Sequence, residues 1–287
     1  MTDIAPEAFL ATTHSRRIGT VRRHWAAALA FAYLAILMFW VIFPAKFAAF
    51  DPLAVSIVSK LKSPSAEHLF GTDHLGRDLL SRIIFGTQNS LMSTLIAVVI
   101  GLLIGSIVGL ISGFSPARID SAIMRVVDIL LAIPNLLLSL AIVTALGFGL
   151  VPVAIAVGIG SIGSFARIMR SEVIRVKELP FVESAHLLGA SPVSVAIRHV
   201  LPHSWGPVVA LSAIEFGAAV LSVSALSFLG FGAPPPEIEW GLLVSEGRKF
   251  ISASWWLIAF PSLFIVLTVI AANTLGRFLE QKLGTAY

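Results

Sequence analysis

Residues 171–203 read SEVIRVKELPFVESAHLLGASPVSVAIRHVLPH, a polar stretch set between long runs that carry no charge. Apolar residues recur at helical spacing on both sides of its centre: Phe181, Val182, Ala185 and Leu188 before it, and Val193, Ala196, Ile197, Val200 and Leu201 after it. At the centre, Gly189 suits the left-handed residue that ends a helix. Ser191 suits the cap of the next helix, and Pro192 suits its first position. The stretch therefore predicts two short amphipathic helices joined by a sharp turn.

Composition places this hairpin in a membrane protein. Of 287 residues, 57% are hydrophobic and only 13% are charged, and the mean hydropathy is +0.92, which excludes an ordinary soluble domain. The chain has no cysteine, which excludes disulfides and Cys-ligated metals. The pI near 9.8 would suggest nucleic acid for a soluble protein, but here the basic residues serve topology, so we expect no nucleic-acid partner.

Uncharged runs predict six transmembrane helices. Residues 25–45 are long enough to cross a hydrocarbon core of about 30 Å at about 1.5 Å per residue. The uncharged run 129–166 is too long for one span, and Gly147-Phe148-Gly149 with Pro152 divides it. Pro134 is expected to bend the third span, and residues 237–249 are expected to form a polar connection. The predicted spans are 25–45, 88–113, 127–146, 151–169, 206–229 and 255–275.

Charge predicts the orientation. With residues 1–24, 114–128, 167–203 and the C-terminal tail on one side, that side holds 13 of the 20 Lys and Arg residues. The positive-inside rule therefore makes both termini and the hairpin cytoplasmic. In this arrangement 1–24 is a cytoplasmic tail, 46–87 is an extracytoplasmic segment, and 88–280 is a five-span core.

The predicted hairpin, residues 171–203, resembles the EAA loop of the membrane subunits of ABC importers. That pattern is Glu-Ala-Ala, three residues, Gly, and a downstream Leu-Pro, and the positions here that match it or shape its turn are Glu183, Ser184, Ala185, Gly189, Pro192, Leu201 and Pro202. Ser184 replaces the middle Ala, and His199 stands where many members have Ile. Ser is small enough to keep a close approach, and His-Val-Leu-Pro is typical of the peptide-importer branch. The resemblance implies a coupling helix that docks in a groove of an ATPase subunit, whereas the alternative is an ordinary cytoplasmic hairpin.

A second stretch of sequence indicates which branch of the ABC importer permeases the chain resembles. Residues 68–82, HLFGTDHLGRDLLSR, resemble the Gly-Thr-Asp-x-Leu-Gly-Arg-Asp-x-x-Ser-Arg signature of the dipeptide, oligopeptide and nickel permeases. Residues 124–134 and 225–232 and the pairs Trp240-Gly241 and Trp255-Trp256 agree with it. The resemblance covers about 65–280 and is to the DppC/OppC type, the second of two paired permeases.

This resemblance implies an all-α polytopic membrane protein with the type I ABC importer permease fold and a cytoplasmic coupling helix-turn-helix. Such a chain is a non-catalytic subunit of the bacterial inner membrane that forms half of a pathway for peptides or a related small solute. Its implied partners are a DppB/OppB-like permease, one or two ATPase subunits and an extracytoplasmic solute-binding protein, besides membrane lipid. ATP and Mg would be bound by the ATPases and no cofactor by this chain, which has no Gly-Lys dipeptide and hence no P-loop.

Two other classes stay open. An ion-driven secondary transporter predicts inverted repeats and broken helices with ion ligands at the membrane midplane, and no clear repeat is visible. A membrane scaffold that conducts nothing is the other, and the glycine-lined and polar helices weakly disfavour it.

Glycine recurs at every fourth residue of the predicted second span, at Gly101, Gly105, Gly109 and Gly113. This spacing leaves one helix face without side chains, so another backbone can approach closely. We expect packing within the subunit, and the alternative is a face against a partner subunit.

Several polar residues have two interpretations. Glu215 is the only acid deep in a predicted span, and it belongs either to the pathway or to a polar seam with Ser212, Ser222 or a partner chain. Asp128 is expected to pair with Arg125 or to face the ATPase side. The tryptophans 240, 255 and 256 are expected to be interfacial anchors. His68, Asp73, His74 and Asp78 resemble metal ligands, but turn and cap roles explain them equally well, and we predict no metal site.

Overall fold

The computed structural model describes residues 7–284, with the side chains of 24–185 and 187–282, and every regular element in that part of the chain is a helix. The long helices are α1 (Glu7–Ile42), α3 (Leu79–Phe114), α6 (Leu150–Lys177), α9 (Leu201–Phe228) and α11 (Trp256–Gly284). Between them lie α2 (Pro44–Phe47), α4 (Ala117–Ala132), α5 (Asn135–Leu146), α7 (Pro180–Leu187), α8 (Pro192–Val195), α10 (Trp240–Gly247), a π-turn (Ala196–Val200) and two 3-10 turns (Ile57–Ser59, Arg248–Phe250).

Five helical segments of the described chain are long and apolar enough to cross a membrane. The pair α4–α5, bent by 92°, makes a sixth crossing if it counts as one span. This agrees with the six predicted spans and with an all-α polytopic protein.

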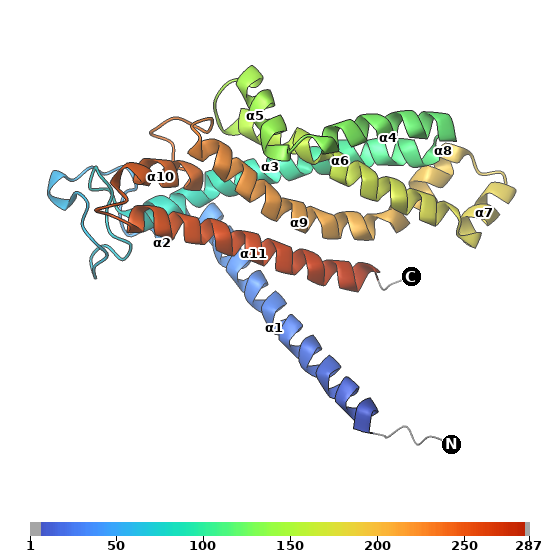
Figure 1. Cartoon of the computed structure of the whole chain (residues 1–287), viewed down its shortest axis with the longest axis horizontal. Helices are drawn as coiled ribbons and strands as arrows, with labels where there is room; N and C mark the ends of the chain where they lie inside the picture. Colours follow the sequence, from blue (N-terminus) through green and yellow to red (C-terminus); the bar gives the residue numbers. More distant parts are fainter. Residues whose placement is uncertain (1–6, 285–287) are drawn as a thin grey trace.

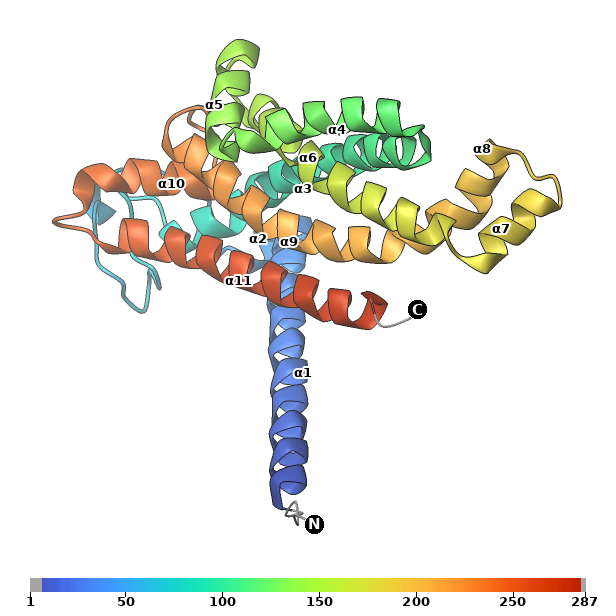
Figure 2. The same ribbon diagram turned by 45° about the vertical axis from the view of Figure 1, so that its right-hand side comes forward.

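The bundle has two distinct ends. In Figures 1 and 2, α7 and α8 project from one end, whereas α10 and the segment between α2 and α3 lie at the other. Helices α3 and α11 run toward the α7–α8 end, α9 runs back, and α1 diverges from the bundle. The Gly149 amide donates to the Phe231 carbonyl (3.0 Å), which places the α5–α6 turn beside the α10 end of α9.

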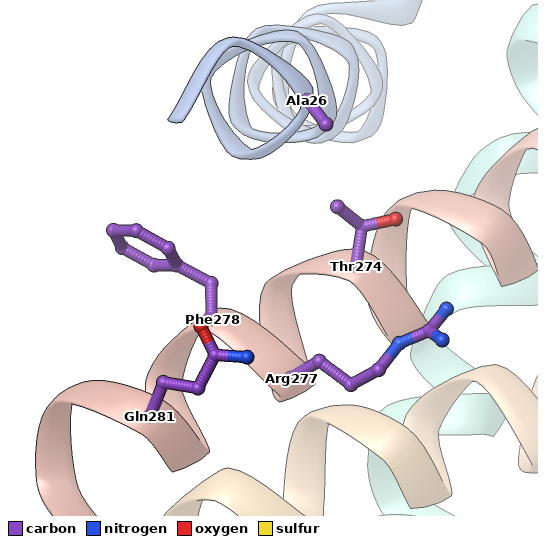
Figure 3. A pocket seen from close by; sticks show the side chains of 5 residues that line it. All are labelled: Ala26, Thr274, Arg277, Phe278 and Gln281. Carbon is purple, nitrogen blue, oxygen red and sulfur yellow. The ribbon is translucent and has the colours of Figure 1, made fainter. Parts of the chain in front are cut away.

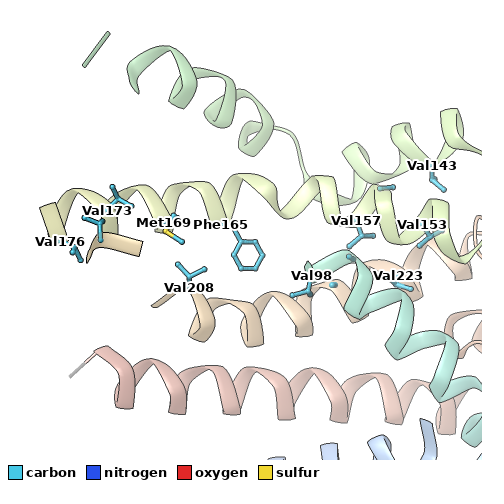
Figure 4. Packing of buried hydrophobic residues seen from close by; sticks show 14 of the residues in the cluster. Val98, Val143, Val153, Val157, Phe165, Met169, Val173, Val176, Val208 and Val223 are labelled. Carbon is cyan, nitrogen blue, oxygen red and sulfur yellow. The ribbon is translucent and has the colours of Figure 1, made fainter. Parts of the chain in front are cut away.

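The centre of the bundle is the contact of α3 with α6. A Cβ added at Gly105 would lie 2.6 Å from the Ile162 carbonyl oxygen and 2.6 Å from Phe165 Cβ. Gly101, Gly109 and Gly113 face the same helix, and Gly158 of α6 faces α3 in return. In a membrane, where lipid is as apolar as a side chain, such close backbone packing is a main source of helix association. Figure 4 shows the valines, Phe165 and Met169 that fill the space between α6 and its neighbours.

Two helices extend beyond their predicted bounds because their charges are paired. Helix α3 begins at Leu79 rather than near 88, since Asp78 Oδ2 caps it by accepting from the Ser81 amide (2.8 Å) and Arg82 is held in ion pairs. Helix α6 continues to Lys177 rather than ending near 169. There Arg170 pairs with Asp120 of α4.

The predicted third span, 127–146, is not one straight helix. Its helix starts earlier, at Ala117, and stops at Ala132. Ile133 and Pro134 have extended backbone angles (ψ 128° and 126°), as expected because a residue before proline avoids the helical region. A new helix, α5, then starts at Asn135 in another direction.

The second helix of the predicted hairpin is also different, since it continues into the next span. From Pro192 the chain passes through the π-turn directly into α9, so the predicted span 206–229 forms the later part of one longer segment. Pro202 lies in the first turn of α9, where a missing N–H is tolerated.

Two expectations for the α10 end were wrong. Residues 237–249 are not merely a polar connection, because Glu239 caps the helix α10. Trp240 and Trp256 are 0% and 6% exposed and belong to a core cluster, so they are not interfacial anchors, whereas Trp255 is 58% exposed. A buried indole N–H group needs a hydrogen-bond acceptor. The Trp240 indole donates to the Ile83 carbonyl (3.1 Å), and the Trp256 indole donates to the Thr72 carbonyl (3.3 Å).

Candidate functional site

The helical hairpin of α7 and α8 is built by its turn. Gly189 has φ +83°, the left-handed conformation that ends α7, and the Ala190 amide returns to the Ala185 carbonyl (3.1 Å). Ser191 Oγ then accepts from the Ser194 amide (3.3 Å), and Pro192 occupies the first turn of α8. A Cβ added at Gly189 would meet nothing within 4 Å, so this glycine is required by its backbone angle and not by space.

The hairpin packs one set of apolar residues inward and leaves another in the open. Val182, Val195 and Val200 are almost fully buried in the main core cluster. Three residues of the predicted faces lie outside the core instead: Leu188 (88% exposed), Val193 (68%) and Ile197 (56%). Leu187, which neither predicted face included, is also exposed (83%). Exposed apolar patches of this kind mark interaction surfaces in many proteins. We call these four residues the outer hairpin surface.

The base of the hairpin is braced against the bundle. Lys177 Nζ donates to the Gly113 carbonyl at the end of α3 (2.8 Å). Arg170 makes two hydrogen bonds to Asp120 of α4, from Nε (2.6 Å) and from NH2 (2.5 Å). These contacts join the end of α6, from which the hairpin extends, to α3 and α4.

The other matched positions of the loop differ in their exposure. Glu183 is exposed, and Ser184 Oγ donates to the Pro180 carbonyl (2.8 Å) within α7. Ala185 is buried, which leaves Glu183 and Ser184 available to a partner. Leu201 and Pro202 begin α9, the span that carries the hairpin.

At the opposite end, the residues considered as metal ligands have other partners. Asp73 Oδ2 accepts from Arg77 Nε (2.7 Å) and Arg82 NH1 (2.6 Å), and Arg82 also binds Glu246 of α10 (2.9 Å). Burial raises the pKa of Asp73, but the two arginines and the amides of Arg77 and Leu75 outweigh it and hold the pKa below its usual value. Among the side chains described, no three His, Asp or Glu are gathered in a metal-binding arrangement.

The remaining members of that segment have structural roles. Asp78 caps α3 and its Oδ1 lies 2.9 Å from His68 Nδ1. His74 stacks on Phe250 with ring centroids 5.2 Å apart. The segment 68–82 is thereby fixed to α3 by a cap and to α10 by an ion pair.

Two acids in or near the spans have partners that the sequence did not indicate. Glu215 of α9 is half-buried and lies beside Ser164 of α6. Asp128 pairs with Arg167 of α6 (2.7 Å) instead of Arg125. Both pairs join helices far apart in sequence, so no local spacing could reveal them.

One buried acid escaped sequence analysis. Glu239 is 0% exposed, its Oε1 accepts from the Gly241 amide (3.3 Å), and its Oε2 has no hydrogen-bond partner within the described residues. Burial raises its pKa to about 7. Its place just before Trp240 is the one available signal, since acids are favoured as helix caps.

Known proteins resemble this chain over most of its length. The di/tripeptide transport permease of Pseudomonas aeruginosa is 38% identical over 257 residues, covering 88% of this chain and 85% of that protein. The glutathione transport permease of Escherichia coli is 39% identical over 263 residues, covering 91% and 87%. The dipeptide transport permease of Alkalihalophilus pseudofirmus is 38% identical over 225 residues, covering 78% and 74%.

Solved structures agree on the fold. The inward-facing MetNI methionine ABC transporter has a chain with TM-score 0.57 at 17% identity, covering 70% of this chain and 96% of that one. A crystal structure of an amino acid ABC transporter with histidines gives TM-score 0.55 at 17% identity, covering 71% and 94%. The helical bundle is thus the type I ABC importer permease fold.

The family model for binding-protein-dependent transport system inner membrane components matches residues 101–285, which include the hairpin, α9 and α11. The family model, the fold and the similarity to the permeases named above all lead to one assignment. This chain belongs to the binding-protein-dependent transport family and is a non-catalytic, membrane-embedded permease subunit of an ABC importer.

Proposed function

We propose that the α7–α8 hairpin couples this permease to an ATPase subunit and that the outer hairpin surface is where the ATPase docks. What supports this is one observation: four strongly exposed aliphatic residues on a hairpin that is braced to three helices of the bundle. ATP and Mg are then bound by the ATPase, and Glu183 and Gly189 set the geometry of the contact.

The subunit contributes half of a pathway completed by a second, homologous permease of the DppB/OppB type. A solute-binding protein delivers the substrate to the α10 end, which is the extracytoplasmic side in this proposal. The substrate is a peptide or a related small solute, by analogy with the di/tripeptide, dipeptide and glutathione permeases that the chain resembles. Glu215, half-buried between α6 and α9, is the proposed pathway acid.

Co-purification tests the docking surface. In Leu188→Asp a charge replaces a side chain that is 88% exposed, so the fold loses no core contact while the apolar surface is broken. We expect the variant to reach the membrane normally but to retain little P-loop ATPase in mild detergent, as measured by mass spectrometry of bound subunits. Val58→Asp is the matched control, since Val58 is 85% exposed at the other end, and it should retain the ATPase.

Gly189→Asp tests the coupling itself. Its φ of +83° is one that Asp tolerates better than most residues, and a Cβ there meets nothing, so the helices should stay folded. We expect ATP hydrolysis to continue without solute uptake. Normal uptake in this variant would refute the proposal that the turn of the hairpin sets the coupling geometry.

A further inference from the structure

A pocket of about 240 Å³ opens between α1 and α11, toward the hairpin end of α11. It is lined by Ala26 of α1 and by Thr274, Arg277, Phe278 and Gln281 of α11. Figure 3 shows Ala26 facing these four side chains across the space between the helices. The pocket exists because α1 diverges from α11 here instead of packing along it.

The walls combine a cation with apolar surface. The Arg277 side chain is exposed, and its Nε makes one long hydrogen bond to the Asn273 carbonyl (3.4 Å). Among the side chains that the structure describes, no carboxylate lies within ion-pair distance of Arg277, and Glu280 is not part of the lining. The Phe278 ring and the Ala26 methyl group supply the apolar side of the pocket.

Hydropathy places this pocket at the membrane–water boundary. Arg277 is the first charged residue after the uncharged run 250–276, and Ala26 stands at the start of the run 25–45. Trp25, beside Ala26, is 69% exposed, as expected of an aromatic residue at the level of lipid headgroups. Two helices thus reach the same boundary independently, with the pocket between them.

Lys282 and His24 lie against one wall of the pocket. Lys282 Nζ lies 5.0 Å from the centroid of the Phe278 ring, and the His24 ring meets the same phenyl ring edge-on at 5.7 Å. In the sequence, four arginines precede Ala26 within residues 16–23. Basic residues next to a membrane span attract anionic lipids through the negative surface potential of the membrane.

We propose that this pocket binds the phosphate headgroup of an anionic phospholipid, with Arg277 as its principal ligand. A guanidinium donates two parallel hydrogen bonds to phosphate oxygens, and the apolar walls suit the glycerol and the first methylenes of the lipid. The pocket opens laterally between two spans, where lipid reaches it and soluble anions meet apolar surface. The proposal requires only that α1 and α11 span the membrane, so it stands whether or not the hairpin docks an ATPase.

The test uses the transporter purified with its partner subunits in mild detergent. Binding of dioleoylphosphatidylglycerol and of dioleoylphosphatidylcholine is measured by native mass spectrometry for the parent, for Arg277→Gln and for Lys282→Gln. Lys282→Gln makes the same charge change five residues further along α11 but outside the lining. We expect phosphatidylglycerol to bind the parent in preference, and Arg277→Gln to weaken that binding about tenfold or more, equivalent to about 1.4 kcal/mol. Lys282→Gln should weaken it less than threefold or so.

Other outcomes would overturn the proposal. Equal losses in both variants would mean general attraction to a basic surface. No loss in Arg277→Gln, or no lipid bound by the assembled complex, would mean that this pocket holds none, as when a partner subunit fills it. Displacement of the lipid by millimolar inorganic phosphate would mean a site for soluble anions, whereas the lipid proposal expects phosphate to have no effect.

Discussion

At the scale of single residues, Glu239 decides how α10 begins. The side chain caps α10 from a fully buried position, with one oxygen left without a hydrogen-bond donor among the residues described. Because burial disfavours the charged form, the pKa rises from 4.5 to about 7. The carboxyl group therefore stays protonated in the folded protein over a pH range in which it is ionised in the unfolded chain.

This makes stability depend on pH with a definite sign. Between pH 4.5 and about 7 the folded state binds a proton that the unfolded state has released, so stability falls as pH rises, by up to roughly 3 kcal/mol in all. Glu239→Gln keeps a cap oxygen and cannot ionise, so we expect it to unfold at a higher temperature than the parent at pH 8 and to differ little at pH 5. Thermal unfolding in detergent at the two pH values measures this.

The control for this change is Glu237→Gln, which removes an exposed carboxylate two residues earlier. It should leave the pH dependence of the parent in place. If Glu239→Gln is less stable than the parent at pH 8, the carboxylate is stabilised there by a partner and the argument from burial fails.

At the scale of elements, α3 and α6 pack closely because glycines on α3 leave no side chains between the two backbones. All four spaced glycines of α3 turn toward α6. An added Cβ at Gly105 or Gly109 would collide with backbone and Cβ atoms of α6, and one at Gly101 or Gly113 would collide with the side chain of Ser161 or Val173. Lipid offers the helices no hydrophobic reason to associate, so this proximity carries the packing energy. The same helix exposes Val99, Leu103, Ile107 and Ile111 on other faces.

A leucine on the glycine face should therefore separate the two helices. Gly105→Leu places a side chain where even a Cβ lies 2.6 Å from backbone and side-chain atoms, and overpacking typically costs about 1–3 kcal/mol or more. We expect loss of a monodisperse peak in detergent gel filtration and loss of uptake. Ile107→Leu, on the exposed face of α3, should behave as the parent, and a fully active, well-expressed Gly105→Leu would contradict this view of the packing.

At the scale of the whole molecule, the two ends of the bundle are chemically different. One end carries the hairpin with its outer apolar surface, and the other carries α10 and the segment 68–82, joined by the Arg82–Glu246 pair. An importer needs this polarity, because solute arrives at one end and ATP is used at the other. Positive charge predicts that the hairpin end is cytoplasmic.

Because the chain has no cysteine, single cysteines can report this orientation without a background. A membrane-impermeant maleimide should label Val58→Cys in intact spheroplasts, since Val58 is 85% exposed at the α10 end. Leu188→Cys, 88% exposed on the hairpin, should be labelled only in inverted vesicles, prepared from cells that lack the ATPase because the ATPase would cover it. Labelling of Leu188→Cys from outside would reverse the proposed topology.

Features that depend on local chemistry and on composition could be predicted from the amino-acid order. Uncharged runs predicted the number of spans, and Gly189, Ser191 and Pro192 predicted the turn of the hairpin, because turn and cap preferences act within a few residues. The surroundings of individual polar and aromatic residues could not be predicted, because they depend on contacts between distant elements. Arg82 lies inside a helix because Asp73 and Glu246 neutralise it, Trp240 is buried because α3 and α11 cover it, and Glu215 meets Ser164 from a distant helix. These outcomes depend on which elements meet in space, and a linear pattern of charge and hydropathy does not contain that information.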